Sequence, residues 1–428
     1  MALAHFANLA HLADLDVCVR GLRRDMIDFT TELIAIASEN PPGAAYGECV
    51  RVIQSRLRAL ELPCDTIAYR PPTSLRARSG AGTEAAVAAG AGAAVVLSRV
   101  GDERKKRALY FSGHYDVVPV TTPGQCTPVL EGKTLFGRGS ADMKGGLASM
   151  LYAAVALKRL AVPLNGHVAL VFVPDEETGG HRGSGFLAAT NRLGANGIGM
   201  LTPEPTSGVI WNANRGALTV RVTVHGREAH VGLMHQGRNA FEDAIRVVTG
   251  LQRLARRVGR RRTRFRVTPD AARRSLMLIG GRVEAGSNFN VVPGRCVFTV
   301  DRRMNPEEDY DAERQALFAV FDEARRDGVK LDVELFQEGR PSGTPDATPL
   351  GRALSSHVRE VTGKAPKFEL CPGLLEIRFY AERGMPAYAY GPGLLSISHG
   401  PKEFVDTDRI VDCAMIYARV AATVLGGS

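Results

Sequence analysis

Long apolar stretches are absent from this chain of 428 residues. No run of about 18 consecutive apolar residues occurs, as a membrane-spanning helix requires. The opening residues 1–8 lack the basic start and the continuous apolar run of a secretory signal, and two acids, Asp14 and Asp16, lie soon after them. We therefore expect neither a membrane span nor a signal peptide.

Paired cysteines are also missing. The seven cysteines are an odd number, are widely scattered and form no C-x-x-C motif. This spacing speaks against a disulfide framework and against a thiolate zinc site, and it fits a reducing compartment. We therefore expect a cytoplasmic protein.

Net charge is absent outside one segment. Residues 252–274 hold ten arginines and a single acid, Asp270, so this segment accounts for the whole formal net charge of +9. Such a run could contact phosphate backbones, and a non-catalytic binding protein that uses segment 253–274 is one open alternative. No recognised nucleic-acid-binding module accompanies the run. We expect no nucleic-acid partner and interpret the segment as a solvated loop or an oligomer contact.

The order of predicted elements divides the chain into two domains. Strands alternate with helices up to about residue 214, which predicts an α/β fold with a mostly parallel sheet flanked by helices. From residue 217 the order strand, helix, strand, strand, helix, strand predicts a ferredoxin-like α+β domain. Residues 80–93, rich in alanine and glycine, predict a loop. We predict a catalytic domain of residues 1–214 and 341–428 and an inserted domain of residues 215–340.

Imidazole and carboxyl groups lie at the ends of the predicted strands. His114 ends an apolar strand and Asp116 comes two residues later, where it could accept the second ring N–H of the histidine. The doublet Glu176-Glu177 comes after the buried strand 168–173. Two adjacent carboxylates point in different directions, so one can bind a metal ion while the other handles protons.

Three further candidates lie beside glycine or proline: Asp142 in a glycine-rich turn that opens a helix, Glu204 between two prolines, and His399 before the final helix. Each alone is more often structural, for example as a helix N-cap. All five elements together predict a hydrolase that activates water with two metal ions ~3.5–4 Å apart. Oxygen and nitrogen ligands with little sulfur suit zinc, cobalt or manganese.

These motifs resemble those of a known family. The order G-H-x-D-V-V-P, G-R-G-x-x-D-M-K-G-G, D-E-E-x-G-G, x-E-P-T and S-H-G is similar to that of the dinuclear metallopeptidases, which include aminoacylases, acetylornithine deacetylase, succinyl-diaminopimelate desuccinylase and glutamate carboxypeptidases. The resemblance implies two divalent ions, with zinc first and manganese or cobalt as alternatives. One ion would be held by His114, Asp142 and Glu204, and the other by Asp142, Glu177 and His399. It also implies that Glu176 is the general base, that Asp116 orients His114, and that the peptide bond after Asp142 is cis.

The inserted domain and the last part of the chain carry further likenesses to this family. His230 resembles a histidine that reaches the active site of a partner subunit, so the inserted domain would act as a lid and as the contact of a homodimer or larger homo-oligomer. The resemblance implies substrate-binding roles for five other residues: Asn290, Arg303, Arg378, Gly391 and Gly393. One stretch departs from the family, because Leu374 and Leu375 stand where smaller, polar residues are usual.

The leading hypothesis is a metal-dependent hydrolase of the C–N bond in an N-acyl amino acid, a small peptide or a related carboxylate-bearing compound. The apolar residues Leu374 and Leu375 beside Arg378 keep a second hypothesis open, an aminohydrolase that releases ammonia from a nitro-substituted aminobenzoate. The metal ligands would be the same in both cases, so the sequence leaves the substrate open.

Overall fold

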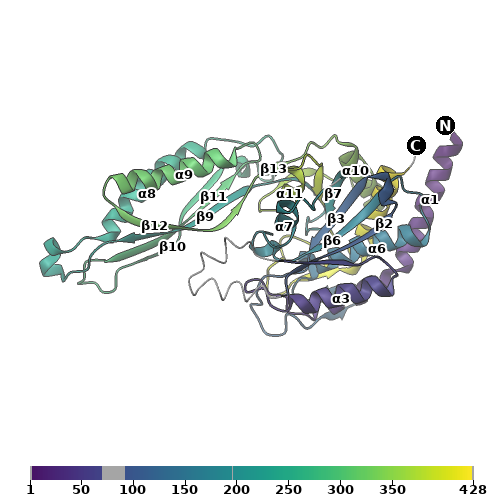
Figure 1. Ribbon diagram of the computed structural model, residues 1–428, viewed down its shortest axis with the longest axis horizontal. Helices are drawn as coiled ribbons and strands as arrows, with labels where there is room; N and C mark the ends of the chain where they lie inside the picture. Colours follow the sequence, from purple (N-terminus) through teal and green to yellow (C-terminus); the bar gives the residue numbers. More distant parts are fainter. Residues whose placement is uncertain (1, 70–91, 195, 427–428) are drawn as a thin grey trace. The chain divides into compact units, whose positions relative to one another are not determined.

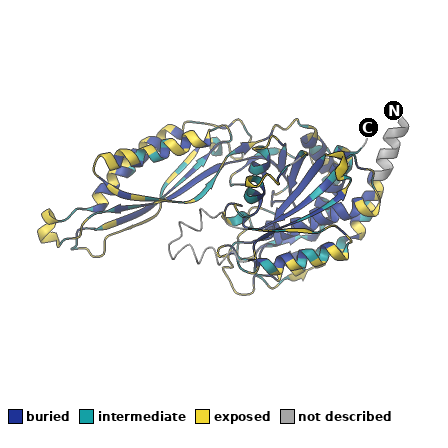
Figure 2. Ribbon diagram, in the orientation of Figure 1, coloured by how far each residue is buried: buried dark blue, intermediate teal, exposed yellow. Residues whose placement is uncertain are grey.

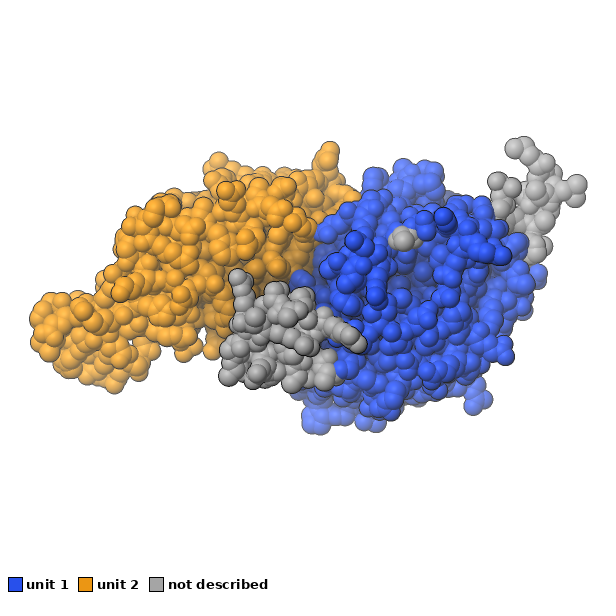
Figure 3. Space-filling model, viewed as in Figure 1, with its two compact units in different colours: residues 1–212, 344–368, 376–428 blue, residues 213–343, 369–375 orange. Residues whose placement is uncertain are grey.

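The protein forms two compact units in the computed structural model, which describes residues 2–69, 92–194 and 196–426. Unit 1 comprises residues 1–212, 344–368 and 376–428, and unit 2 comprises residues 213–343 and 369–375 (Figure 3). Segment 369–375, which our prediction counted with the catalytic domain, belongs to unit 2, where the Leu370 N–H donates to the main-chain oxygen of Arg266 at 2.7 Å.

Unit 1 is built around a large sheet with the strand order β1-β2-β6-β3-β7-β15-β8 (Figure 1). Strands β6, β3, β7 and β15 at its centre are parallel, and the outer pairs are antiparallel. The predicted α/β class with a parallel central sheet is confirmed. The strands are β1 (Asp65–Ala68), β2 (Ala94–Gly101), β3 (Ala108–His114), β6 (His167–Val173), β7 (Gly197–Thr202), β15 (Ala387–Ala389) and β8 (Ile210–Asn214).

Helix α6 (Gly145–Arg159) is buried all round from Gly145 to Leu157, because it lies between the sheet and helix α12 (Thr407–Leu425) (Figure 2). A helix that is apolar on every side is stable only in such a position. Its burial fixes the turn before it, which carries Asp142. The other helices of unit 1 are α1 (Ala2–Gly21), α2 (Arg23–Ile34), α3 (Tyr46–Ala59), α7 (Ser184–Ala189), α10 (Pro349–Thr362) and α11 (Ile377–Ala381).

Unit 2 has the ferredoxin-like element order. Its antiparallel sheet has the order β10-β11-β9-β12, and α8 and α9 pack together beside it. Along β9 the exposed Arg221 lies between the buried Val220 and Val222, as expected for a sheet with one covered face. The elements are β9 (Gly216–His225), α8 (Ala240–Val258), β10 (Leu276–Ala285), β11 (Arg295–Met304), α9 (Tyr310–Arg326), β12 (Lys330–Gly339) and β13 (Ser342–Gly343).

Short strands are the main elements that the sequence did not predict. A small sheet in unit 1 pairs β16 (Phe404–Asp406) with β5 (Thr134–Phe136), which also pairs with β4 (Val129–Glu131). Three-residue strands are too short for a periodic pattern, and the same holds for β14 (Phe368–Cys371). Most of the loop predicted at 80–93 lies outside the described residues. Among the described helices, none is long and apolar enough to cross a membrane.

Candidate metal centre

Three parallel strands deliver predicted metal ligands to one edge of the sheet. His114 is the last residue of β3, Glu176 and Glu177 begin the 3-10 turn after β6, and Glu204 comes shortly after β7. Strand β3 pairs with both β6 and β7 in parallel register. The carboxyl ends of parallel strands meet at the same edge, where open α/β sheets bind their ligands.

Asp142 lies between two histidines and joins two groups of candidate ligands. The ligand atoms of His114, Asp142 and Glu204 all lie within 4.8 Å of one another, and so do those of Asp142, Glu177 and His399. His114 Nε2 is 3.3 Å from Asp142 Oδ1, and His399 Nε2 is 3.3 Å from Asp142 Oδ2. Each oxygen of Asp142 thus faces a different group, which is the geometry of a bridging carboxylate. The Asp142–Met143 peptide bond is cis, as predicted.

Two buried carboxylate oxygens support the fit of this site to divalent cations. Glu177 Oε1 and Glu204 Oε1 have no hydrogen-bond partner in the part of the chain that the structure describes. A buried polar atom without a partner costs free energy, and a bound cation removes that cost. The remaining donors are imidazole nitrogen and carboxylate oxygen, without sulfur, which suits zinc, manganese or cobalt.

The charges of the ligands depend on one another. Burial raises the pKa of Glu204 to about 8. Burial acts in the same direction on Asp142, but hydrogen bonds with His114 and His399 outweigh it and hold the pKa of this carboxyl well below its usual value. The hydrogen bonds of His399 with Asp142 and Glu177 raise the pKa of its imidazole to about 10. Protons therefore occupy groups from which a binding cation must displace them.

Asp116 makes hydrogen bonds that position His114 and the glutamate doublet. His114 Nδ1 lies 3.0 Å from the main-chain oxygen of Asp116, which can only accept, so Nδ1 carries a proton. A cation that displaces the proton from Nε2 would therefore bind at Nε2. The two side-chain oxygens of Asp116 accept the main-chain N–H groups of Glu176 and Glu177 at 3.1 and 3.2 Å. The Asn40 amide donates to Asp116 Oδ2 at 2.8 Å. Asp116 thus connects the first ligand with the glutamate doublet, and sequence reasoning missed Asn40.

Glu176 belongs to neither ligand group although it is the neighbour of Glu177. Burial raises the pKa of the Glu176 carboxyl well above its usual value, and the nearby Glu204 carboxylate raises it further. Two divalent cations beside it would lower this pKa again. A carboxyl group poised in this way can both accept and return a proton.

A buried ion pair holds two ligand loops, and sequence reasoning missed it. Arg138 Nη1 lies 2.7 Å from Glu403 Oε2, and both side chains are almost completely buried. Glu403 Oε1 accepts the main-chain N–H groups of Ala141 and Asp142, each at 3.0 Å. Arg138 Nη2 donates to the main-chain oxygen of His399 at 3.3 Å. The only signals in the sequence were an arginine between two glycines and an acid four residues after His399.

The predicted substrate residues of unit 1 lie close to this centre. Arg378 is buried on α11 and donates to the main-chain oxygen of Gly179, at the end of the glutamate turn, at 2.6 Å. A Cβ atom on Gly391 would lie 2.3 Å from the main-chain oxygen of Glu204, and one on Gly393 would lie 2.4 Å from that of Ala141. Only glycine allows these close approaches. The substrate-binding roles themselves stay a prediction.

Unit 2 brings two of its three predicted site residues together. The N–H of Val231, next to exposed His230, donates to the main-chain oxygen of Asn290 at 2.9 Å. Arg303 lies near the other end of β11 from Asn290, on the order of 25 Å away by strand rise. It pairs there with Asp301 at 2.9 Å. Within one copy of unit 2, Arg303 and Asn290 therefore do not clamp the same small substrate.

The arginine-rich segment takes part in the fold of unit 2. It forms the end of α8 and the loop after it. Arg261 pairs with Glu308 and Glu313, and Arg262 pairs with Asp270. Arg264, Arg266 and Arg273 also lie within 4.0 Å of acidic partners. At least half of the arginines in this segment thus form intramolecular ion pairs.

Comparison with known proteins points in the same direction as this geometry. The family described as Peptidase family M20/M25/M40 matches residues 110–423. The chain is 27% identical to succinyl-diaminopimelate desuccinylase of Marinobacter nauticus over 419 residues, which cover 93% of this chain and 98% of that protein. It is 28% identical to acetylornithine deacetylase of Myxococcus xanthus, over 78% of this chain and 84% of that protein.

Solved structures share the fold. A metallo-carboxypeptidase of Sulfolobus solfataricus superimposes with a TM-score of 0.74 at 17% identity, covering 93% of this chain and 98% of that one. A dipeptidase of Saccharomyces cerevisiae superimposes with a TM-score of 0.72 at 16% identity, covering 97% and 99%.

Proposed function

The chain belongs to peptidase family M20/M25/M40 and is a metal-dependent hydrolase of amide bonds, and from this premise we propose that it cleaves an N-acyl amino acid or a small peptide that carries a carboxylate. The observation that carries this proposal is the pair of ligand groups joined by Asp142, with the free carboxyl of Glu176 beside them. These two ligand groups would hold metal ions that bind the attacking water and the carbonyl oxygen of the substrate, and Glu176 would carry the proton.

Glu176 performs the proton transfers in this proposal. Its carboxylate accepts a proton from the attacking water, whose oxygen adds to the carbonyl carbon of the substrate. When the C–N bond breaks, Glu176 returns the proton to the leaving nitrogen, so the products are a carboxylic acid and an amine. Asp116 holds the main chain of Glu176 in place during both steps.

Five side chains would hold the metal ions: His114 and Glu204 at one position, Glu177 and His399 at the other, and Asp142 at both. When bound, two divalent cations supply Lewis acidity and lower the pKa of water towards ~7. Zinc fits best, with manganese and cobalt as alternatives.

Assembly into a homodimer through unit 2 is part of the proposal. Strand β10 is an edge strand, and Leu276, Leu278 and Val283 on it are exposed. Helix α8, which contacts β10, exposes Phe241 and Ile245. An edge strand with neighbouring exposed apolar side chains favours pairing with another strand. In such a dimer, the exposed His230 of each subunit would reach the metal centre of the other subunit and act there in catalysis.

A substrate panel tests the proposed activity. N-succinyl and N-acetyl amino acids, dipeptides and aminobenzoates are offered to the enzyme loaded with zinc, manganese or cobalt, and released amine is measured. We expect turnover of at least one carboxylate-bearing amide, and loss of turnover when its carboxylate is amidated. Hydrolysis of amides without a carboxylate at equal rates would contradict the proposed substrate class.

The aminohydrolase alternative is tested by the same panel. It rests on Leu374 and Leu375 as an apolar wall for an aromatic acid, but Leu375 is only 3% exposed and is part of the protein interior. Release of ammonia from a nitro-substituted aminobenzoate, without activity on N-acyl amino acids, would favour this alternative.

A further inference from the structure

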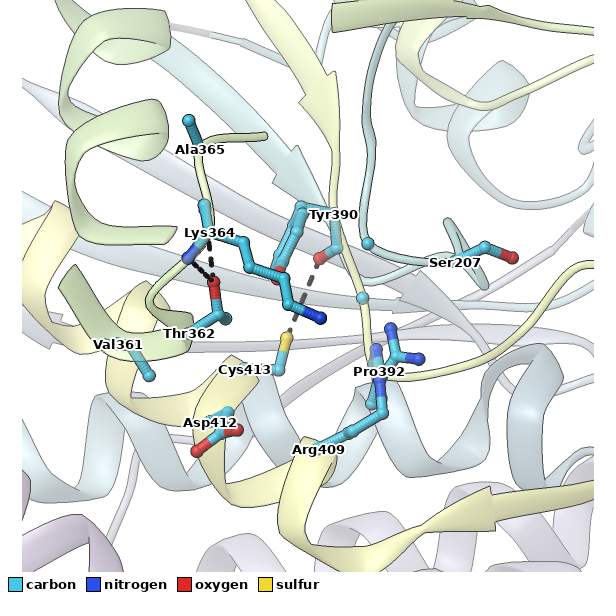
Figure 4. A pocket seen from close by; sticks show the side chains of 12 residues that line it. Ser207, Val361, Thr362, Lys364, Ala365, Tyr390, Pro392, Arg409, Asp412 and Cys413 are labelled. Atoms are coloured by element: carbon cyan, nitrogen blue, oxygen red, sulfur yellow. Dashed lines mark hydrogen bonds between the residues drawn. The ribbon is translucent and has the colours of Figure 1, made fainter. Parts of the chain in front are cut away.

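A cavity of about 400 Å³ lies in unit 1, apart from the predicted metal ligands. It is enclosed by the end of α10 and the turn after it, by the first turns of α12, and by residues 390–392 after β15 (Figure 4). Small-molecule sites are typically ~300–1,000 Å³ in volume. The cavity is therefore large enough for a small ligand.

Two cations project into this cavity from different walls. Lys364, in the turn after α10, and Arg409, in the first turns of α12, both extend into the space beneath Tyr390 and Pro392 (Figure 4). No ion pair of either side chain occurs among the described residues. Two other charged residues of α12 form ion pairs: Asp408 with Arg23 and Lys133, and Arg419 with Asp16. Arg409 thus differs from Asp408 and Arg419 on the same helix, because it forms no ion pair among the described residues.

The lining sets two cations against a single carboxylate. Its one carboxylate belongs to Asp412, and burial raises the pKa of this group above its usual value. Asp412 forms no ion pair with Lys364 or Arg409 within the part of the chain that is described. Two like charges that face one small space repel each other, and an anion between them converts this repulsion into attraction. The planar fork of an arginine matches two oxygens of a carboxylate or phosphate, and a lysine adds a point charge.

We propose that this cavity is a binding site for a small carboxylate or phosphate anion, held by Lys364 and Arg409, and that its occupancy modulates the metal centre. This site goes beyond the proposed amide hydrolysis, because neither cation belongs to the metal centre or to the predicted substrate residues.

Only the main chain of Gly391 separates this cavity from the main chain of the predicted ligand Glu204. Gly391 lines the cavity, and a Cβ atom on it would lie only 2.3 Å from the main-chain oxygen of Glu204. The N–H of Gly391 donates to Thr206 Oγ1 at 3.3 Å, and the N–H of Ser207, which also lines the cavity, donates to the main-chain oxygen of Gly393 at 3.1 Å. An anion that draws Arg409 or the Gly391 segment inward therefore presses on the segment that carries Glu204.

Titration calorimetry on the metal-loaded enzyme tests the site, with inorganic phosphate and acetate as separate probes. We expect saturable binding of at least one probe that weakens about tenfold or more in the double variant K364Q/R409Q, because hydrogen bonds to charged groups are worth that much. The matched control is R359Q/K367Q, which removes two nearby exposed cations that do not line the cavity. This control should bind as the wild type does.

Each outcome supports or overturns the proposal. Stronger binding of phosphate assigns a phosphate-bearing ligand, and stronger binding of acetate assigns a carboxylate. Equal binding in wild type and K364Q/R409Q would place the anion elsewhere, for instance at the metal ions, and would overturn the proposal, as would equal weakening in the control. For the coupling, the bound probe should change the kcat of wild type but not of the double variant. Unchanged kcat at saturation would overturn the modulation.

Discussion

Single carboxylates differ in what they do at this site because their surroundings differ. Glu176 and Glu177 are neighbours in the chain, yet only Glu177 lies with its carboxylate 3.2 Å from His399 Nε2 and within a ligand group. Asp116 accepts the main-chain N–H groups of both residues and thereby holds the turn that carries them. Substitutions of individual residues should therefore separate proton transfer from metal binding.

Glu176→Gln should keep both metal ions and lower kcat by ~10²–10⁴-fold, the usual contribution of general acid–base catalysis. The amide has the shape of the carboxyl group but cannot accept the proton. Metal content and kcat are measured together, with exposed Glu131→Gln as the control. If Glu176→Gln instead loses metal and keeps its rate per bound ion, the roles of Glu176 and Glu177 are reversed.

Asp142→Ala should lose both metal ions, whereas His399→Ala should lose mainly one, because only Asp142 contacts both groups. Metal per subunit is measured by elemental analysis after dialysis, and folding is checked by circular dichroism. Equal loss in the two variants would contradict the bridging role of Asp142.

Arg378→Lys should raise KM and cost ~1.5–3 kcal/mol of substrate binding, because lysine keeps the charge but loses the two-pronged contact with a carboxylate. Kinetics are compared for a substrate and its carboxyl-amidated form. Amidation should harm the wild type strongly and the variant little more. Equal processing of both forms by both proteins would show that Arg378 does not bind a carboxylate.

The Arg138–Glu403 ion pair connects two segments of unit 1 that lie far apart in the sequence. It joins the turn before α6 to the loop before β16, and these segments carry Asp142 and His399. The small sheet of β5 and β16 runs alongside it, since Phe404 pairs with Phe136. The position of two ligands therefore depends on a contact between two residues that belong to neither ligand group.

Glu403→Leu should destabilise the protein by about 3–5 kcal/mol, as for other broken buried ion pairs, and should also weaken metal binding. Glu403→Gln keeps an oxygen for the N–H groups of Ala141 and Asp142, so it should retain more metal than Glu403→Leu at the same temperature. Unfolding midpoints and metal affinity are both measured. The control Arg23→Gln breaks the half-exposed pair with Asp408 and should change metal affinity little. Unchanged metal affinity in Glu403→Leu would mean that the pair serves stability alone.

Assembly is the property of the whole molecule on which the proposed role of His230 depends. This histidine is exposed on unit 2 and accepts the Gly232 N–H through Nδ1 at 3.1 Å, which leaves Nε2 available to a partner. The exposed apolar side chains of α8 and β10 lie in the same unit.

Mixing inactive His230→Ala with inactive Glu176→Gln should restore part of the activity. In a hybrid dimer one of the two composite sites carries both wild-type residues, so recovery approaching half of the hybrid's capacity is expected. Subunit exchange is verified by native mass spectrometry. Lack of recovery after verified exchange would mean that His230 acts within its own chain or has no catalytic role.

Much of the architecture can be predicted from the sequence alone. The buried strand 167–173, helix α6 and the strand pattern of unit 2 are set by local apolar periodicity and turn residues. The motif order likewise predicted His114, Asp142, Glu177, Glu204 and His399, and the structure brings these five residues together. Ligands at strand ends are predictable because parallel strands end at one edge.

Other features were decided only by the tertiary structure, because they depend on contacts between residues far apart in the chain. No local pattern indicates that Glu403 meets Arg138, that Asn40 meets Asp116, or that Arg409 and Lys364 face one cavity. The arginine-rich segment shows the same limit: its charge is plain in the sequence, but its acidic partners lie on other elements of unit 2. Periodicity specifies which face of an element is buried, whereas packing and strand register specify which side chains meet on it.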